Sequence, residues 1–216
     1  MEIIFARHGS DEYDEKGLIH PPEAPLSTKG LSQARALARR LSDMRIDEIV
    51  SSPYARAAQT ADLVASALGK KVVHSDLLRE WSMPRTMHGK PMADAESQRV
   101  REEMWQHAGN PEWHPVEGET FSEARRRSAE ALAYVENLNV HRVLAVAHGN
   151  IIRLMLLQMM FGDGFDPQIA RGVLRFHNMA NTGLTVCSND QGIWRMITWN
   201  DFSHLKDYLL NSKEGH

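Results

Sequence analysis

Short apolar runs alternate along this chain with longer stretches in which apolar residues recur every three or four positions. Near-continuous apolar runs at residues 3–6, 46–50 and 143–147 are typical of strands covered on both faces, and a weaker run at 71–74 predicts a fourth strand nearer an edge. Strands that alternate with helices build βαβ units. The pattern therefore predicts an α/β fold, with a mostly parallel central sheet and helices on both of its faces.

The helical stretches have recognisable ends. Ser27 is a good N-cap for a helix with apolar positions at 31, 34, 37, 38 and 41. Helices at 54–68 and 151–161 are expected to stop before Gly69 and Gly162, because glycine is favoured just after a helix end. A further helix is expected at 120–138.

Two segments fall outside this alternation. Residues 81–118 hold several prolines and glycines around one short helix at about 94–107, which predicts a lid-like insertion over one end of the sheet. Residues 184–187 and 193–199 flank a turn that contains Gly192, so they predict a hairpin of antiparallel strands. No change of composition divides the chain, and residues 1–216 are expected to form a single domain.

Composition narrows the classes of partner. The chain has 216 residues, 42% of them hydrophobic and 25% charged, and a net charge of −3 with scattered Lys and Arg residues. This distribution favours small molecules over nucleic acids or membrane surfaces as partners. No run approaches the roughly 20 apolar residues that span a bilayer, and the single cysteine, Cys187, favours a reducing, cytoplasmic setting. The oligomeric state is left open.

Two histidines follow predicted strands in the same way. Arg7-His8-Gly9 follows the first strand, and Ala147-His148-Gly149-Asn150 follows the strand at 143–147. Each triplet alone fits a surface loop or a core histidine. Ligands of open α/β sheets bind at the carboxyl ends of strands, so the pair predicts two imidazoles facing one crevice. The helix that begins there would also offer free N–H groups to an anion.

Three further motifs occur between these two histidines. They are Leu26-Ser27-x-x-Gly30-x-x-Gln33-Ala34, Ser51-Ser52-Pro53-x-x-Arg56-Ala57-x-Gln59-Thr60-Ala61, and Leu78-Arg79-Glu80. As an ordered set, and together with Asn200-Asp201-x-x-His204-Leu205 near the end, they are highly specific. The chain resembles the histidine phosphatase superfamily, also called phosphoglycerate mutase-like, over most of its length.

The resemblance implies a three-layer α/β sandwich and a set of roles. His8 is the expected nucleophile, Arg7, Arg56 and His148 surround the phosphate, and Glu80 is the proton donor. Further expected substrate contacts are Gly9 and Gly149, where the backbone can approach the phosphate closely, and Ser10 and Asn150. The resemblance implies neither a metal nor a cofactor, and none of the remaining histidines has the spacing of a metal site.

These residue types suit phosphate chemistry. A phosphate monoester dianion repels nucleophiles, so a site must place fixed positive charge on its oxygens and an attacking atom in line. Arginine is always charged and matches phosphate with a planar fork. A neutral imidazole can attack, which divides one difficult displacement into two easier ones. A buried carboxylic acid such as Glu80 can supply the proton that the leaving alcohol needs.

Two stretches depart from the family pattern. The family places neutral phosphate-binding residues shortly after Arg-His-Gly, whereas this chain has Asp11 and Asp14. Carboxylates repel phosphate, so this loop is expected either to turn away or to meet a cationic or hydroxyl-rich part of the substrate. The segment after Glu80 lacks the Tyr-Gly of the glycolytic mutases, although Asn150 is mutase-like.

The leading hypothesis is a metal-independent phosphomonoester hydrolase that acts on a small phosphorylated metabolite through a phosphohistidine. A cofactor-dependent phosphoglycerate mutase is the nearest alternative. A non-catalytic phosphate-binding module is the alternative from another class, and the joint presence of His8, Arg7, Arg56, Glu80 and His148 argues against it.

Overall fold

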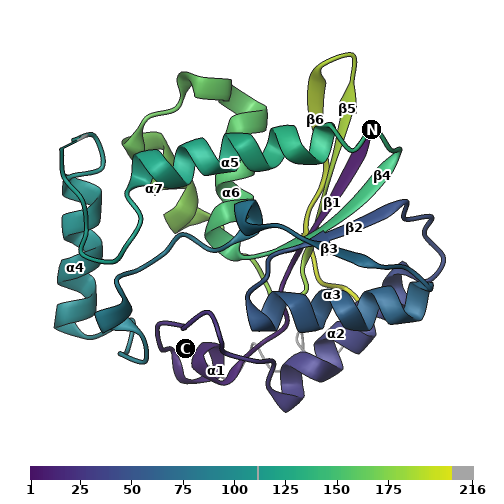
Figure 1. The fold of residues 1–216 in the computed structure, drawn as a ribbon, viewed down its shortest axis with the longest axis horizontal. Helices are drawn as coiled ribbons and strands as arrows, with labels where there is room; N and C mark the ends of the chain where they lie inside the picture. Colours follow the sequence, from purple (N-terminus) through teal and green to yellow (C-terminus); the bar gives the residue numbers. More distant parts are fainter. Residues whose placement is uncertain (111, 206–216) are drawn as a thin grey trace.

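The computed structural model describes residues 1–110 and 112–205, and a six-stranded sheet runs through its centre (Figure 1). The strands lie in the order β3-β2-β4-β1-β5-β6. Their bounds are β1 Glu2–Arg7, β2 Glu48–Ser51, β3 Val72–His74, β4 Arg142–Ala147, β5 Leu184–Asp190 and β6 Ile193–Asp201. The first four are parallel to one another, and the β5–β6 hairpin continues the sheet in antiparallel register. The predicted sheet, its weak edge strand and its hairpin are confirmed.

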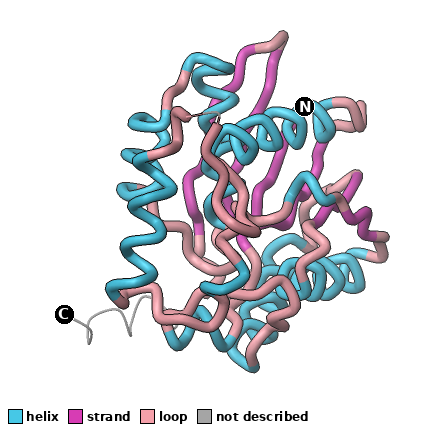
Figure 2. Tube along the Cα trace, turned by 60° about the vertical axis from the view of Figure 1, so that its left-hand side comes forward, coloured by secondary structure: helices cyan, strands magenta, loops and turns pink. Residues whose placement is uncertain are grey.

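Helices cover both faces of the sheet, which makes the molecule a three-layer α/β sandwich (Figure 2). Successive side chains of β1 point to opposite faces. Ile3 and Phe5 pack with α5 (Phe121–Glu136) and α6 (Gly149–Phe161), whereas Ile4 and Ala6 pack with α2 (Thr28–Leu41) and α3 (Ala55–Leu68). All four side chains are fully buried. The continuous apolar run in the sequence is therefore a strand between two cores.

Side-chain caps fix where the helices begin. The Ser27 hydroxyl accepts a hydrogen bond from Gly30 N at the start of α2, as the sequence predicts. Thr120 and Glu123 form a reciprocal capping box at the start of α5. Gly69 takes the left-handed conformation just after α3.

Some elements differ from the sequence-based expectation. The second strand begins at Glu48 rather than residue 46, and α6 begins at Gly149 rather than 151. Two helices were not expected, α1 (Glu12–Lys16) and α7 (Pro167–Phe176). Asp166 caps α7 and Pro167 occupies its first turn, a start signal that the sequence does carry.

The segment from 81 to 118 holds α4 (Ala95–Gln106), which stands to one side of the sheet in Figure 1. A third apolar cluster attaches it to the sandwich, in which Trp81 and Met104 pack with Phe121 of α5 and Phe165 before α7. Within the described ranges, no helix is both long and apolar enough to cross a membrane. Burial raises the pKa of the Cys187 thiol to about 12, in keeping with an unreactive cysteine.

Candidate active site

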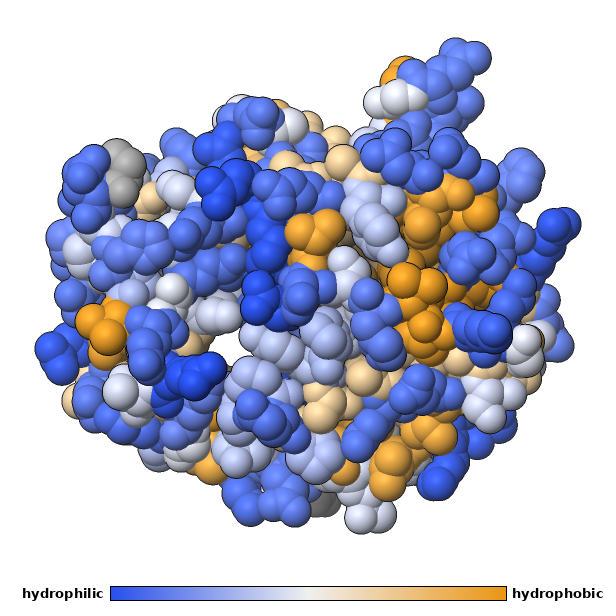
Figure 3. Space-filling view, viewed as in Figure 1, coloured by the Kyte–Doolittle hydropathy of each residue, from blue (hydrophilic) through white to orange (hydrophobic). Residues whose placement is uncertain are grey.

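A cleft of about 900 Å³ opens at the carboxyl ends of the parallel strands. Its wall includes Arg7, His8, Arg56 and Glu80, together with residues of the segment 81–118. Figure 3 shows the surface hollowed between α4 and the region of α1, with hydrophilic residues around the opening. The cleft lies where the strand order predicts a ligand site.

His8 lies in the cleft wall, and the fully buried His148 ring packs beside it without belonging to the described wall. The two strand–His–Gly motifs thus bring their imidazoles together, as predicted. Their ring centroids are 5.0 Å apart. His8 Nδ1 lies 2.7 Å from the carbonyl oxygen of Gly9, which places the ring hydrogen on Nδ1 and leaves the lone pair on Nε2. Burial, followed by the charges of Arg56 and Arg7, holds the pKa of His8 well below its usual range. His8 is therefore a neutral imidazole with a fixed tautomer and a nucleophilic Nε2.

His148 caps the start of α6 and is fully buried. Its Nε2 lies 2.9 Å from the Ser52 hydroxyl, while its Nδ1 has no hydrogen-bond partner among the described residues. Arg7 Nε, a buried donor, has no partner there either. Burial and the nearby Arg56 and Arg7 lower the pKa of His148 well below its usual range. Unsatisfied buried polar atoms are costly, so their presence beside His8 indicates a place for a hydrogen-bonding ligand.

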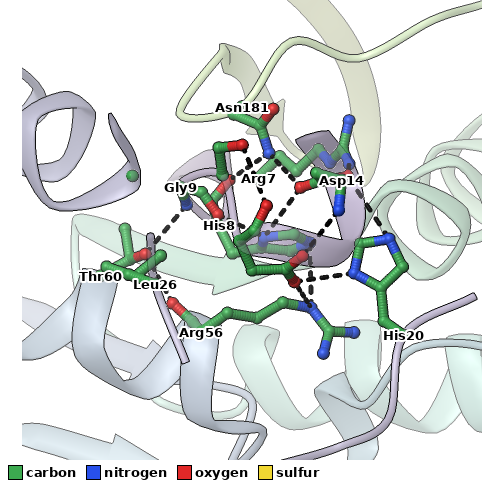
Figure 4. A network of polar contacts seen from close by, with 12 residues as sticks. Arg7, His8, Gly9, Asp14, His20, Leu26, Arg56, Thr60 and Asn181 are labelled. Carbon is green, nitrogen blue, oxygen red and sulfur yellow. Dashed lines mark hydrogen bonds and ion pairs between the residues drawn. The ribbon is translucent and has the colours of Figure 1, made fainter. Parts of the chain in front are cut away.

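Arg7 and Arg56 approach His8 from β1 and α3. Arg7 donates to the carbonyl oxygen of Met179 at 2.6 Å, and Arg56 donates to that of Pro21 at 3.0 Å. The Arg56 Nε also lies 3.2 Å from His8 Nε2. Both guanidinium groups are thus fixed by backbone contacts, and that of Arg56 presents its charge at the nucleophilic atom (Figure 4).

The acidic loop after Gly9 was expected either to turn away from the site or to meet a cationic or hydroxyl-rich part of the substrate. It does neither in the structure, because its carboxylates pair with arginines of the site itself. Asp14 accepts a hydrogen bond from Arg7 at 2.7 Å and one from Asn181 at 2.8 Å. Asp11, fully buried, lies 2.7 Å from His20 Nδ1 and 3.6 Å from Arg56 Nε. Burial opposes ionisation of both carboxyls. It is outweighed at Asp11 by hydrogen bonds from His20 and the Asp14 backbone, and at Asp14 by the charge of Arg7, so the pKa values of both carboxyls are lowered.

Glu80 lies in the cleft wall and caps the helix that His148 begins. Its Oε1 accepts hydrogen bonds from Trp81 N at 2.9 Å and Ile151 N at 3.1 Å, and its Oε2 accepts one from Asn150 N at 3.1 Å. The expectation that these α6 N–H groups are free for a substrate anion was therefore wrong, because the Glu80 carboxylate occupies two of them.

The four expected substrate contacts are placed unevenly. Gly149 and Asn150 belong to the described cleft wall, and Gly9 and Ser10 do not. Gly9 N donates to the Thr60 hydroxyl at 3.0 Å, and Ser10 N donates to Gln33 at 2.8 Å. These two backbone groups thus hold the loop in position, and substrate binding by any of the four residues stays a prediction.

Sequence reasoning missed several members of the site. Ser52, Thr60 and Gln33 lie within the quoted motifs, but nothing in their spacing shows that they support His148 and the Arg-His-Gly backbone. Asn181 and His20 lie outside those motifs and reach the site only because the chain folds back. The signal available for His20 was its place after the unusual acidic loop.

A group of possible metal ligands also forms, although the sequence shows no ligand spacing and no metal was expected. His8, Asp11 and Asp14 each offer one atom within 4.8 Å of the others. Their carboxylates already pair with Arg7 and Arg56, so a cation held there would have to displace or tolerate guanidinium groups.

Comparisons with known proteins show which family the chain belongs to. The family model described as "Histidine phosphatase superfamily (branch 1)" matches residues 3–202. "Probable phosphoglycerate mutase GpmB" of Proteus mirabilis is 28% identical, with 98% of each chain covered. "Putative phosphoserine phosphatase 2" of Hydrogenobacter thermophilus is 29% identical, covering 85% of this chain and 87% of its own. The crystal structure of an Entamoeba histolytica phosphoserine phosphatase mutant with phosphoserine superposes with a TM-score of 0.76 at 22% identity, covering 94% and 98%.

Proposed function

Because this chain belongs to the histidine phosphatase superfamily, we propose that it is a phosphomonoester hydrolase that acts on a small phosphorylated metabolite through a phosphohistidine on His8. The observation that carries the proposal is the state of His8. It is buried and neutral, its Nδ1 is fixed by Gly9, and its Nε2 lies beside the Arg56 guanidinium. An imidazole so arranged can attack phosphorus, and the adjacent cation can stabilise the charge on the transferred group.

The reaction proceeds in two displacements. His8 Nε2 forms a bond to phosphorus while the ester oxygen leaves and takes a proton from the Glu80 carboxylic acid. The Glu80 carboxylate then removes a proton from water, whose oxygen displaces His8 and releases inorganic phosphate. Among the described residues, Glu80 Oε2 accepts a single backbone hydrogen bond, from Asn150 N, which leaves it a lone pair to carry the proton.

An unpaired donor and the size of the cleft support the proposed substrate class. Arg7 Nε is a buried donor without an acceptor, and a phosphate oxygen would supply one. The cleft of about 900 Å³ has room beyond the phosphate for the rest of a metabolite, bounded by the segment 81–118, which would serve as a lid. Gly149 and Asn150 on its wall would contact that part of the substrate, whereas Gly9 and Ser10 would act through the loop backbone.

The test is hydrolysis of para-nitrophenyl phosphate in the presence of EDTA. We expect turnover by the native chain, a loss of about a thousandfold or more in His8→Ala, and no change in His74→Ala, which alters an exposed histidine of β3. Quenching in an alkaline denaturant, which preserves the acid-labile P–N bond, should trap a phosphoenzyme in the native chain and not in His8→Ala. Full activity in His8→Ala, or loss of native activity on adding the chelator, would refute the mechanism.

A cofactor-dependent phosphoglycerate mutase is the second candidate, favoured by the name of the Proteus mirabilis relative and by Asn150 in the cleft. The two are separated by adding 2,3-bisphosphoglycerate and 3-phosphoglycerate. A mutase would form 2-phosphoglycerate, whereas the proposed hydrolase releases inorganic phosphate. A non-catalytic module would do neither.

A further inference from the structure

One guanidinium group of the site is held by two acceptors and keeps a buried donor without a partner. Arg7 donates through Nη1 to the carbonyl oxygen of Met179 at 2.6 Å, and through Nη2 to the Asp14 carboxylate at 2.7 Å (Figure 4). Its Nε has no hydrogen-bond partner among the described residues. The two acceptors therefore decide where Arg7 presents its remaining donor, and a shift of either one would move a charge that a bound phosphate group needs.

The Met179 carbonyl lies in a segment that has no regular structure. Residues 177–180 belong to neither a helix nor a strand, so no ladder of backbone hydrogen bonds fixes them. Asn200, near the end of β6, supplies two hydrogen bonds instead. Its Oδ1 accepts one from Ala180 N at 2.9 Å, and its Nδ2 donates one to the carbonyl oxygen of Asn178 at 3.2 Å. One side-chain amide thus binds the residues on both sides of Met179.

Local structure directs the Asn200 amide toward this segment. The backbone of Asn200 has a φ of 47°, a left-handed conformation that asparagine tolerates better than most residues. The β5–β6 pairing shifts register beside it, between Leu184 and Val186, and such bulges re-aim side chains. Gly183 leaves the necessary room, because a Cβ built there would fall 2.2 Å from Asn200 Oδ1.

On the premise of the proposed function, we propose that Asn200 is a positioning residue for catalysis, which acts through Met179 and Arg7. The amide fixes the Met179 carbonyl, the carbonyl fixes the guanidinium, and the guanidinium holds the phosphate group beside His8. The proposal gives a role to the motif Asn200-Asp201-x-x-His204-Leu205, which the proposed mechanism does not otherwise use. A misplacement of about 1 Å can cost roughly a hundredfold in rate, so the effect is large enough to measure.

Asn200→Asp tests this contact without changing the size of the side chain. The carboxylate still accepts from Ala180 N, but it has no hydrogen to donate and repels the Asn178 carbonyl oxygen. Aspartate also tolerates the left-handed backbone. Asn139→Asp is the matched control, because Asn139 has a φ of 52° and donates through Nδ2 to the carbonyl oxygen of Asn137. This control lies before the amino end of β4, whereas the cleft lies at the carboxyl ends of the strands.

Calorimetric titration with inorganic phosphate, in EDTA, measures the effect without turnover. We expect Asn200→Asp to bind phosphate roughly tenfold more weakly than the native chain, because a charge-assisted hydrogen bond from Arg7 is displaced. In the native chain and in Asn139→Asp the affinities should agree. The value of kcat/KM for para-nitrophenyl phosphate should fall roughly ten- to a hundredfold in Asn200→Asp. Unchanged phosphate affinity in Asn200→Asp would overturn the inference.

A double-mutant cycle separates positioning from a general effect on the fold. The substitution Asn200→Asp is repeated in an Arg7→Gln background, with phosphorus NMR line broadening to reach millimolar affinities. Because the guanidinium that Asn200 positions is absent there, the added substitution should change phosphate affinity by less than about twofold. An equal loss in the two backgrounds would show that Asn200 does not act through Arg7, and would refute the proposal.

Gly183→Ala reaches the same amide by a second route, since the added Cβ would displace Asn200 Oδ1. It should weaken phosphate binding in the native background and have little further effect in Arg7→Gln. A chain that shows this coupling but hydrolyses nothing would refute the proposed function and leave the positioning of Arg7 standing. A chain that hydrolyses para-nitrophenyl phosphate without this coupling would do the reverse.

Discussion

At the scale of single residues, the Arg-His-Gly loop keeps its shape through a contact that a side chain would block. Gly30, near the start of α2, lies against Ser10, and a Cβ built on Gly30 would fall 1.9 Å from the Ser10 carbonyl oxygen. Ser27 N also donates to that carbonyl at 3.0 Å. The motif Leu26-Ser27-x-x-Gly30 therefore acts by docking α2 onto the loop that carries His8.

Gly30→Ala tests this docking. Because the Cβ would overlap a backbone atom, α2 or the loop must move, and we expect a loss of about 2–3 kcal/mol in the free energy of unfolding. The displaced loop should also lower kcat/KM for para-nitrophenyl phosphate by roughly tenfold or more. Urea denaturation and steady-state kinetics measure the two effects.

Gly172→Ala is the matched control for that substitution. Gly172 lies inside α7, and a Cβ there would meet nothing within 4 Å. Alanine is the better helix former, so this variant should gain about 0.5–1 kcal/mol with unchanged kinetics. Equal stability changes in the two variants would show that the contact with Ser10 is unimportant.

At the scale of elements, one arginine of α5 holds the loop that delivers Glu80. Arg127 donates to the carbonyl oxygens of Leu77, Arg79 and Glu80 at 3.0, 2.6 and 3.3 Å. It also forms a two-pronged pair with the Glu119 carboxylate at 2.7 and 2.6 Å. Glu119 in turn accepts hydrogen bonds from two residues that follow Glu80. Its carbonyl oxygen accepts one from Trp81 Nε1, and its carboxylate accepts one from Ser82 N. The pair thus fixes both ends of a segment that has little regular structure of its own.

Arg127→Lys keeps the charge and loses the fork, so it should loosen the loop without leaving Glu119 unpaired. We expect kcat to fall roughly ten- to a hundredfold on an alkyl phosphate, whose leaving group needs the Glu80 proton, with a smaller change in KM. The loss on para-nitrophenyl phosphate should be smaller, because nitrophenolate leaves readily without a proton. Equal losses on both substrates would show that Arg127 does not act through Glu80.

Arg126→Lys controls for a general effect on α5. Its pair with Glu130 spans 3.7 Å between side chains that are 73% and 54% exposed. Such exposed pairs contribute little, so the free energy of unfolding should stay within about 0.5 kcal/mol of the native value.

Elements with a strong local signal could be predicted from the sequence, and those made by contacts between distant segments could not. Buried strands, the caps of α2 and α5 and the glycine after α3 all follow from nearby residues. The same holds for the pairing of His8 with His148, since both end strands of one sheet. By contrast, the ion pair of Arg7 with Asp14 and the contact of His20 with Asp11 depend on how the loop folds back, which charge pattern alone does not fix.

At the scale of the whole molecule, the sandwich encloses imidazoles that it keeps uncharged. His8 and His148 are almost completely buried between the two cores and the arginines, and burial is the first cause of their lowered pKa values. The arrangement that makes His8 a nucleophile thus has a consequence for folding, because the unfolded chain frees both rings to take up protons at their ordinary pKa of about 6.5.

This difference predicts that acid destabilises the fold before the carboxyls titrate. Below about pH 6.5 the unfolded state binds more protons than the folded state, so the free energy of unfolding should fall as pH falls. Each of the two histidines contributes up to about 1.4 kcal/mol per pH unit until its folded pKa is reached. Urea denaturation between about pH 5 and 7 measures this slope, which should be shallower in a His8→Asn, His148→Asn double variant. The lowered pKa values of His88 and His204 leave part of the slope in place in this double variant. A slope unchanged from the native chain would mean that His8 and His148 are not held neutral by the fold.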